Sequence, residues 1–264
     1  MSKINIKPNK LISISIVSHS QIDLIKDLLA DINKYCNASS LELIITLNLS
    51  EILPFDVDSF FFPIKLIRNK APKGFATNNN QAFSQATGQY FCVLNPDVRL
   101  INDPFPRLIE CLNHSSVGVG APLIVDYSGH VEDSARVFPT PFKILCKVFG
   151  CGKGSDYVIE GQVIYPDWVG GMFMLFPRAI FENLKGFNEK FFLYYEDVDL
   201  CARLRLQGYE VVLCPEAKVI HDAQRASHKN LKYFKWHFIS MLSFFCSVVY
   251  LQIFWGKLIR AKVK

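Results

Sequence analysis

Three carboxylates lie within four residues of the segment FFLYYEDVDLCAR, which spans Phe191–Arg203. Glu196, Asp197 and Asp199 follow an aromatic run and stand at the start of an expected amphipathic helix. Acids this close repel one another, and no structural need calls for three of them beside so much apolar surface. A general base or a cation-binding cleft does need negative charge in a partly dry place, so the cluster indicates an active site.

The residue spacing separates the roles of these acids. Asp199 and Arg203 are four residues apart on the expected helix, which predicts a surface salt bridge between them. Asp197 has no such partner, and a position at a helix N-terminus favours its ionised form. A base that accepts a proton from a sugar hydroxyl must be ionised, so Asp197 is the candidate base.

Residues elsewhere could ligate a metal ion. Asp97, in the sequence Asn95-Pro96-Asp97, follows an apolar strand, and its hard oxygen atoms suit Mg²⁺ or Mn²⁺. Taken alone, an Asx turn explains the same residues better. His221 ends an apolar run and could give a ring nitrogen to a metal beside Asp97, although a structural histidine is the more common case. His19, after the first strand, is equally ambiguous.

A glycine turn opens a helix at Lys73–Asn80, KGFATNNN. Backbone N–H groups at such a helix start suit a phosphate or sugar hydroxyls. Three consecutive asparagines are poor helix formers, which indicates that they do something other than support the helix.

The first half of the chain alternates strand and helix patterns, which predicts an α/β fold with a mostly parallel sheet and helices on both faces. In such sheets ligands bind beyond the carboxyl ends of the strands, here the loops Ser18–Gln21, Asn69–Asn80 and Asn95–Arg99. The expected strands are Leu11–Val17, Leu41–Leu47, Phe62–Ile67 and Tyr90–Leu94, and the expected helices are Ile22–Ile32 and Ala76–Ala86.

The second half is less regular. Residues 122–165 are rich in Gly and Pro and predict a loop-rich insertion that shapes an acceptor site. A strand over Trp168–Phe176, a helix over Glu196–Gln207 and a strand over Tyr209–Leu213 follow.

Composition limits the classes of function. Half of the 264 residues are hydrophobic and the net charge is +5, with no basic and aromatic stripe of the kind that nucleic-acid binding needs. The eight cysteines are scattered without a CxxC pair, which favours buried, reduced thiols in a cytoplasmic protein over disulfides or zinc. The first ten residues show no apolar signal-peptide region.

The C-terminal segment differs from the rest. Trp236–Gly256 contains no Asp, Glu, Lys or Arg, and basic residues flank it on both sides. Its length is near the minimum for a transmembrane helix. Aromatic ends and basic flanks favour a helix lying on an anionic membrane surface over a spanning helix or one packed on protein.

Taken together, the motifs resemble the family 2 inverting glycosyltransferases of GT-A fold, and among them the rhamnosyltransferase-like bacterial enzymes of O-antigen and cell-wall polysaccharide synthesis. The matching elements stand in the family's order over roughly residues 11–225. They are ISIVSHS, the helix at Gln21–Ile32, KGFATNNNQAF, VLNPDV, DWVGGMFMLFPRAIF, GFNEKFFLYYEDVDLCARLRLQGY and VVLCPEAKVIH.

The resemblance implies roles for single residues. Asp97 occupies the last position of the family's DxD-type site and, with His221, would hold Mg²⁺ or Mn²⁺ against the donor diphosphate, while Asn95 replaces the first Asp. Asp197 matches the presumed catalytic base, and Glu196 is a supporting acid or an acceptor contact. The other implied contacts to the nucleotide sugar are His19, Asn48, Gly74, Phe75, Asn79, Asn95, Trp168, Gly170 and Gly171.

Two positions depart from the family pattern. Leu47 stands where an Asp usually helps to hold the nucleotide, and Asn95 leaves the metal site with less charge. Metal affinity is therefore expected to depend on the oxygen atoms of the donor diphosphate.

The resemblance implies an inverting transferase that moves L-rhamnose from dTDP-β-L-rhamnose to a lipid-linked saccharide, in the cytoplasm on the inner face of the membrane. A UDP-hexose or UDP-galactofuranose donor is the alternative, and a non-catalytic nucleotide-sugar-binding or scaffold protein is the alternative of another class. The expected domains are residues 1–228, with donor binding mainly in 1–100 and acceptor binding and catalysis mainly in 101–228, and a membrane-associating tail at 229–264.

Overall fold

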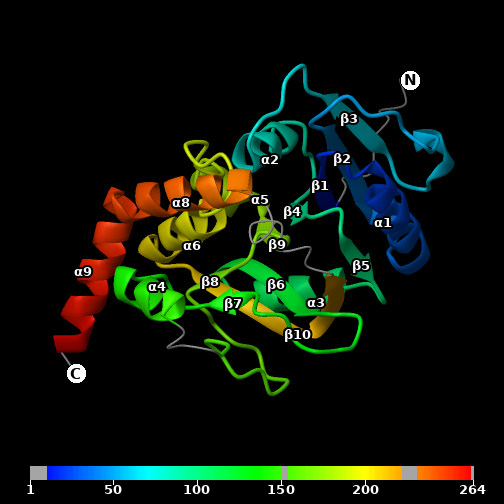
Figure 1. Cartoon of the computed structure of the whole chain (residues 1–264). Coiled ribbons are helices and arrows are strands. Elements are labelled where there is room, and N and C mark those ends of the chain that lie inside the picture. The colour runs from blue at the N-terminus through cyan, green and yellow to red at the C-terminus, as the bar shows by residue number, and fades with distance from the viewer. Residues whose placement is uncertain (1–10, 150–153, 222–230, 263–264) are drawn as a thin grey trace, which may run out of the picture.

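The computed structural model describes residues 11–149, 154–221 and 231–262 (Figure 1). An eight-stranded sheet runs through it in the order β3-β2-β1-β4-β9-β6-β10-β5, and β7 and β8 form a separate pair. The strands are β1 Ile12–Ser18, β2 Leu41–Leu47, β3 Ile64–Arg68, β4 Tyr90–Leu94, β5 Val98–Leu100, β6 Val117–Val125, β7 Ala135–Arg136, β8 Trp168–Val169, β9 Phe173–Pro177 and β10 Glu210–His221.

The sheet is mixed and largely parallel, as the alternating strand and helix patterns predict. Strands β1 to β4 pair in parallel, and so do β6 and β10. Strand β9 runs antiparallel to β4 and β6, and β5 runs antiparallel to β10. All seven residues of β2 are buried, because parallel strands are covered on both faces.

Helices cover both faces of the sheet and enclose two apolar cores. One core receives side chains of α1 and α3, and the other receives side chains of α2, α5, α6, α8 and α9. The α-helices of the described residues are α1 Ile22–Tyr35, α2 Phe75–Phe83, α3 Phe105–Leu112, α4 Pro141–Val148, α5 Arg178–Asn183, α6 Glu196–Leu206, α8 Leu231–Phe245 and α9 Val248–Lys262.

The second half differs most from the sequence prediction. The strand expected over Trp168–Phe176 is divided at Gly170 and Gly171 into β8 and β9. The strand expected over Tyr209–Leu213 continues to His221, because a shift of register between Cys214 and Lys218 accommodates Pro215 within the strand. The expected loop-rich insertion 122–165 contains the end of β6, the short strand β7 and helix α4.

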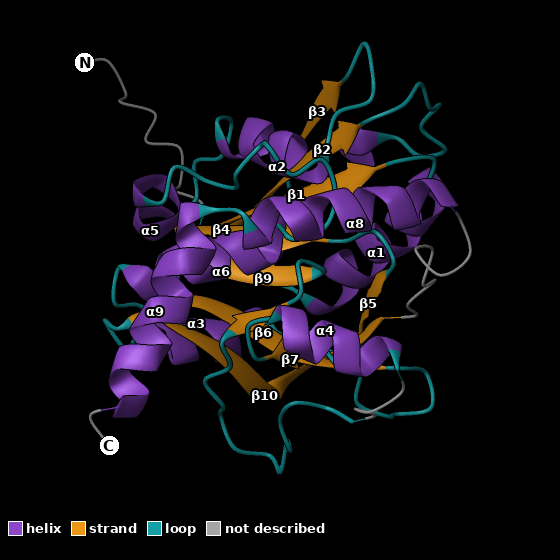
Figure 2. Cartoon of the chain, turned by 60° about the vertical axis from the view of Figure 1, so that its left-hand side comes forward, coloured by secondary structure: helices purple, strands orange, loops and turns teal. Residues whose placement is uncertain are grey.

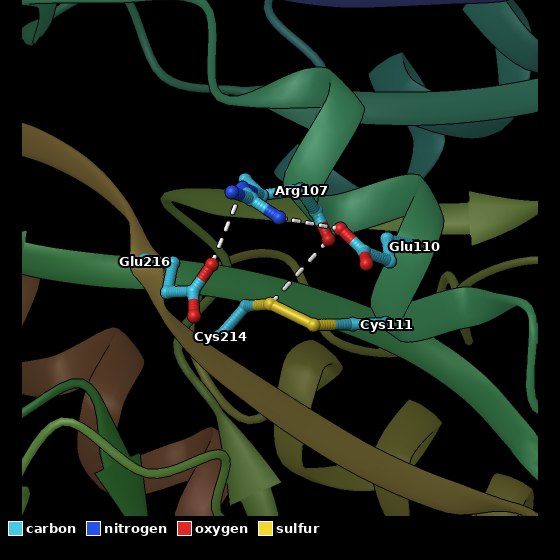
Figure 3. The surroundings of a disulfide bond; sticks show 5 residues. All are labelled: Arg107, Glu110, Cys111, Cys214 and Glu216. Carbon is cyan, nitrogen blue, oxygen red and sulfur yellow. Dashed lines mark hydrogen bonds and ion pairs between the residues drawn. A yellow bond between two sulfur atoms is a disulfide. The ribbon is translucent and has the colours of Figure 1, made fainter.

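The expectation of reduced cysteines is wrong for one pair. Cys111 of α3 and Cys214 of β10 form a disulfide with Cα atoms 6.7 Å apart, beside the ion pairs of Arg107 with Glu110 and Glu216 (Figure 3). Packing of α3 on β10 brings together cysteines that are 103 residues apart in the chain, which spacing alone does not reveal. The other described cysteines are free: Cys36, Cys92, Cys146, Cys201 and Cys246. Cys151 lies outside the described residues.

The C-terminal segment forms two helices instead of the expected one. Helices α8 and α9 meet at a bend of 60°, and within the described residues no single helix is long and apolar enough to cross a membrane, although this bent pair meets the length and composition requirements together. Helix α8 packs on the domain, because Phe244 is buried and Ser240 Oγ donates a hydrogen bond to Leu193 O at 2.9 Å. The expected domain boundary at residue 228 lies outside the described residues.

Candidate active site

Asp97 and His221 come together at one edge of the sheet. Asp97 stands in the turn between β4 and β5, and the antiparallel pairing of β5 with β10 places Val98 opposite His221. Asp97 Oδ2 consequently lies 3.4 Å from His221 Nε2. Asn95 shapes the turn through its backbone, since its N–H donates to Met172 O at 2.9 Å.

A divalent cation fits the chemistry of this pair. Asp97 Oδ1 is buried and has no hydrogen-bond partner, which is unfavourable unless another group meets it. A carboxylate oxygen and an imidazole nitrogen are both ligands of such ions. The described residues bring no third His, Cys, Asp or Glu to this place, so a bound ion would have coordination positions left for solvent or substrate oxygen atoms.

The carboxylates of Glu196 and Asp197 are presented by a strained turn. Tyr194 and Tyr195 both have φ of +68°, a left-handed conformation that is rare for bulky residues, and α6 starts directly after them. Backbone strain of this kind costs about 1–3 kcal/mol per residue and clusters at functional sites. The aromatic run before the acids was visible in the sequence, but its conformation was not.

Asp197 is held in place by backbone donors. Its Oδ2 accepts a hydrogen bond from Gly171 N at 2.9 Å, and its Oδ1 accepts one from Val198 N at 2.8 Å. Gly171 lies in the turn between β8 and β9, so the break in the expected strand brings a donor to the candidate base.

Burial changes the protonation expected for this pair. Burial raises the pKa of Asp197, although the N–H groups of Gly171 and Val198 oppose the change. Burial therefore opposes the ionised form that the helix N-terminus favours. Burial and then the charge of Asp197 hold the pKa of Glu196 well above its usual value. Glu196 Oε2 is also buried without a hydrogen-bond partner. Glu196 therefore holds its proton more tightly, and Asp197 is the carboxylate that ionises first.

Asp199 forms the expected salt bridge, but inside the protein and not at its surface. Its side chain is fully buried, and its Oδ2 accepts a hydrogen bond from Arg203 Nε at 2.7 Å. Arg203 also donates to Leu184 O and Gly186 O, so the pair fastens α6 to the segment after α5. Asp199 is thereby occupied by a structural contact.

A cavity of about 460 Å³ lies beside Glu196 and Asp197. The expected insertion contributes to its wall, together with β8, the strained turn and α8. Its lining residues are Arg136, Val137, Pro139, Lys143, Ile144, Asp156, Trp168, Tyr194, Tyr195, Glu196, Asp197, Val198, His237 and Met241. Trp168 is oriented by a hydrogen bond from its Nε1 to Val137 O at 3.0 Å. Arg136 and His237 escaped the sequence prediction, because neither stands in a recognisable motif.

Asn48 joins the loops beyond β1 and β2. Its Nδ2 lies 3.1 Å from His19 Nδ1 and donates to Lys73 O at 2.9 Å, while its Oδ1 accepts from Lys73 N and from Asn69 Nδ2. His19 and Asn48 therefore meet, as their shared role implies. Leu47, at the position of the family's usual Asp, is buried in the apolar core.

The three asparagines of α2 fasten the helix to three neighbours. Asn78 bonds to Asn69 and Lys73, and Asn80 bonds to the backbone of Phe187. Asn79 is fully buried: its Oδ1 accepts from Ser15 Oγ at 2.8 Å and its Nδ2 donates to the helix backbone. The asparagines thus have a task outside helix formation, as expected, and the donor-pocket role implied for Asn79 stays a prediction.

Close packing explains why Gly74 and Gly170 have no side chain. A Cβ on Gly74 would lie 2.5 Å from Phe192 O, and one on Gly170 would lie 2.8 Å from Met172 Sδ. Phe75 donates its N–H to Phe192 O at 2.9 Å, so the α2 start is held against the segment that leads to the strained turn. Gly74 consequently allows the close approach of these two segments, and its implied place in the loop that lines the nucleotide-sugar pocket stays a prediction.

Comparison with known proteins gives a consistent result. Residues 13–160 match the sequence model of glycosyl transferase family 2, and residues 158–233 match that of the N-terminal domain of galactosyltransferase. The chain is 28% identical to rhamnosyltransferase WbbL of Escherichia coli (strain K12) over 86% of this chain and 89% of the relative. It is 27% identical to the N-acetylglucosaminyl-diphospho-decaprenol L-rhamnosyltransferase of Mycobacterium tuberculosis (strain ATCC 25618 / H37Rv) over 63% of this chain and 61% of the relative.

Solved structures share the fold. GalNAc-T7, solved with UDP, GalNAc and Mn²⁺, superposes with a TM-score of 0.61 at 15% identity over 81% of this chain and 44% of that one. The mannosyltransferase PcManGT of Pyrobaculum calidifontis, solved with GDP-Man and Mn²⁺, superposes with a TM-score of 0.59 at 18% identity over 83% of this chain and 59% of that one. The GT-A fold expected from the motifs is therefore confirmed.

Proposed function

The chain belongs to glycosyl transferase family 2, and from this membership we propose that it is a metal-dependent inverting enzyme that transfers L-rhamnose from dTDP-β-L-rhamnose to a lipid-linked saccharide. The observation that carries the proposal is the carboxylate pair on the wall of the cavity, with Asp197 held by two backbone donors and the buried Glu196 beside it. The names of the two rhamnosyltransferase relatives support the choice of sugar.

The reaction is a single displacement. Asp197 accepts the proton of an acceptor hydroxyl, and the oxygen attacks the anomeric carbon of the donor sugar as the bond to the nucleoside diphosphate breaks. Attack opposite to the leaving group inverts the configuration. The raised pKa of Asp197 increases its strength as a base while it remains the first carboxylate of the pair to ionise.

Asp97 and His221 are the residues that would hold Mg²⁺ or Mn²⁺. When bound, the ion neutralises charge on the departing diphosphate. The unpaired Oδ1 of Asp97 supports this assignment, and the two candidate ligands found among the described residues agree with an ion that completes its coordination on the diphosphate.

The two halves of the chain have different proposed roles in substrate binding. We assign donor binding mainly to residues 1–100, where His19, Asn48 and Asp97 lie, and acceptor binding mainly to the region after residue 100. The cavity supports the second assignment, because its lining residues begin at Arg136. Helix α8 contributes His237 and Met241 to the same cavity, so part of the C-terminal segment helps to form the site.

We place the enzyme in the cytoplasm on the inner face of the cell membrane, with the C-terminal helices on the lipid surface. A lipid-linked acceptor cannot leave the bilayer, so an enzyme docked there gains local concentration. The absence of acidic residues after Asp222 supports contact with anionic lipid.

A donor screen tests the proposal. Purified protein is incubated with dTDP-rhamnose, UDP-glucose, UDP-galactose and UDP-galactofuranose, with Mn²⁺ or Mg²⁺ and then with EDTA, and nucleoside diphosphate release is measured. We expect turnover of dTDP-rhamnose that EDTA abolishes, and a similar loss in the Asp97→Ala variant. Turnover of UDP-sugars alone would overturn the choice of rhamnose, and binding without turnover in the presence of acceptor would favour the non-catalytic alternative.

A further inference from the structure

Helix α4 carries exposed apolar side chains beside the cavity. Phe142 and Leu145 are 77% and 55% exposed, whereas Lys143 and Ile144 of the same helix line the cavity wall. A short helix of a water-soluble surface would place polar residues at such positions. The exposed face of α4 thus calls for a partner.

Helices α8 and α9 carry more side chains of the same kind. His237 and Met241 of α8 line the cavity, which therefore lies between α4 and α8. Figure 2 shows α4 and α8 on the face turned to the viewer, with α9 beside them. Their exposed large apolar side chains are Leu231, Phe234, Phe238, Ile239, Leu242, Val248, Leu251, Phe254 and Trp255.

The charge of this surface identifies its partner as an anionic bilayer. Lys232 and Lys235 of α8 are exposed, and neither α4 nor α8 contains an acidic residue. Lys143 of α4 is paired with Asp156 on the cavity wall, so the exposed lysines that the structure describes here belong to α8. Lys232 Nζ lies 4.9 Å from the centre of the Trp236 ring, a pairing of cation and aromatic group that suits the headgroup region. Apolar side chains bordered by lysines fit lipid tails and anionic headgroups together.

We propose that α4 and α8 form two sides of one membrane-docking surface that seats the mouth of the cavity in the bilayer interface. A lipid-linked acceptor then reaches Asp197 from the plane of the membrane, between the two helices, while its tail stays in lipid. The identity of the acceptor rests on the proposed function, but docking through α4 does not. Sequence patterns predicted membrane contact for the C-terminal segment alone.

Vesicle sedimentation tests the role of α4 without any sugar donor. The full chain, a Phe142→Gln/Leu145→Gln variant and a control Ile52→Gln/Phe61→Gln variant are mixed with vesicles of phosphatidylglycerol and phosphatidylethanolamine, or of phosphatidylcholine alone. Ile52 and Phe61 are 91% and 81% exposed in the loop between β2 and β3, far from α4 (Figure 1). Glutamine keeps helix propensity, so loss of fold is not expected.

We expect the α4 variant to bind anionic vesicles about tenfold more weakly than the full chain, because each apolar side chain withdrawn from lipid weakens binding. The control variant should bind like the full chain, and phosphatidylcholine vesicles should bind all three weakly. Unchanged binding of the α4 variant would overturn the proposal. A dimer seen by analytical ultracentrifugation and dissolved by the α4 substitutions would also overturn it, since a second copy would then cover this face.

Activity separates the docking role from the catalytic one. With the donor that the screen identifies, the α4 variant should lose about tenfold in transfer to a long-chain acceptor in anionic vesicles and keep its transfer to a short-chain, water-soluble analogue. Equal loss with both acceptors would contradict docking as the role of α4. Failure of the sugar assignment would leave the vesicle-binding result intact, so the two proposals fail separately.

Discussion

The proposed donor side, with Asn48 and Asn79, and the proposed acceptor side, with Glu196 and Asp197, differ in how their buried polar groups are hydrogen-bonded. On the donor side, the amides of Asn48 and Asn79 are used in hydrogen bonds within the protein. On the acceptor side, Glu196 Oε2 is buried without a partner, and two successive tyrosines hold a strained backbone. The buried amides of Asn48 and Asn79 stabilise the fold, whereas the unpaired Glu196 Oε2 and the strained tyrosines belong to the segment that presents the candidate base.

This difference distinguishes two motifs of the family that have different roles in the protein. The KGFATNNN motif shapes a helix start and ties it to its neighbours, and the EDVD motif presents the candidate base. Asp97, at the border between the two sides, belongs with the second kind, since its Oδ1 is also unpaired. Substitutions should therefore lower stability on the donor side and activity on the acceptor side.

Replacing the candidate base should give the largest effect. In Asp197→Asn, the single amide oxygen can accept from Gly171 N or from Val198 N but not from both, so a modest loss of stability is expected, and the side chain cannot take a proton. We expect transfer to fall by about 10³-fold, within the range for loss of a general base, at a temperature where the variant is still folded by circular dichroism. The exposed Asp58→Asn is the matched control. Full activity of Asp197→Asn would remove Asp197 from the mechanism.

Replacing a satisfied amide should change stability instead. Asn79→Ala leaves Ser15 Oγ and Phe75 O without their partner in the core. We expect the free energy of unfolding to drop by about 1–3 kcal/mol in urea titration, with kcat/KM at 20 °C changed by no more than about threefold. Asn113→Ala, at an exposed position, should change neither. A loss of activity at unchanged stability would place Asn79 in contact with substrate and abolish the contrast.

The smallest expected effect concerns the pH dependence of stability. The pKa of Glu196 is raised in the folded protein, so between its ordinary value of 4.5 and the folded value the folded state holds a proton that the unfolded state has lost. Stability from this group is present below pH 4.5 and is lost as pH rises through the folded pKa. Glu196→Gln cannot ionise, so this variant does not show the pH-dependent loss in free energy of unfolding. That loss amounts to about 1.4 kcal/mol per unit of pKa shift.

Thermal unfolding from pH 4.5 to pH 9 measures this difference. The variant should become more stable relative to the natural chain as pH rises, and Glu182→Gln, on the surface of α5, should follow the natural chain. Parallel curves for all three proteins would show that Glu196 ionises as freely in the folded state as in the unfolded one.

Local sequence patterns were sufficient for much of the fold. The expected bounds of β2 and β4 match the structure, and α1, α6 and β1 lie within a few residues of theirs. These elements follow from the periodicity of apolar residues, which depends on neighbours in the chain. The candidate base, the candidate metal residues and the family were likewise accessible, because motifs such as NPD and EDVD are local.

Only the tertiary structure decided which distant residues meet and how deeply they are buried. His221 lies beside Asp97 because β5 pairs antiparallel with β10, and Cys214 meets Cys111 because α3 packs on the same strand. The direction of the pKa shift of Asp197 follows from burial, which outweighs the helix N-terminus visible in the sequence. Pairing across a sheet and desolvation in a packed site arise from residues far apart in the chain, so no local pattern encodes them.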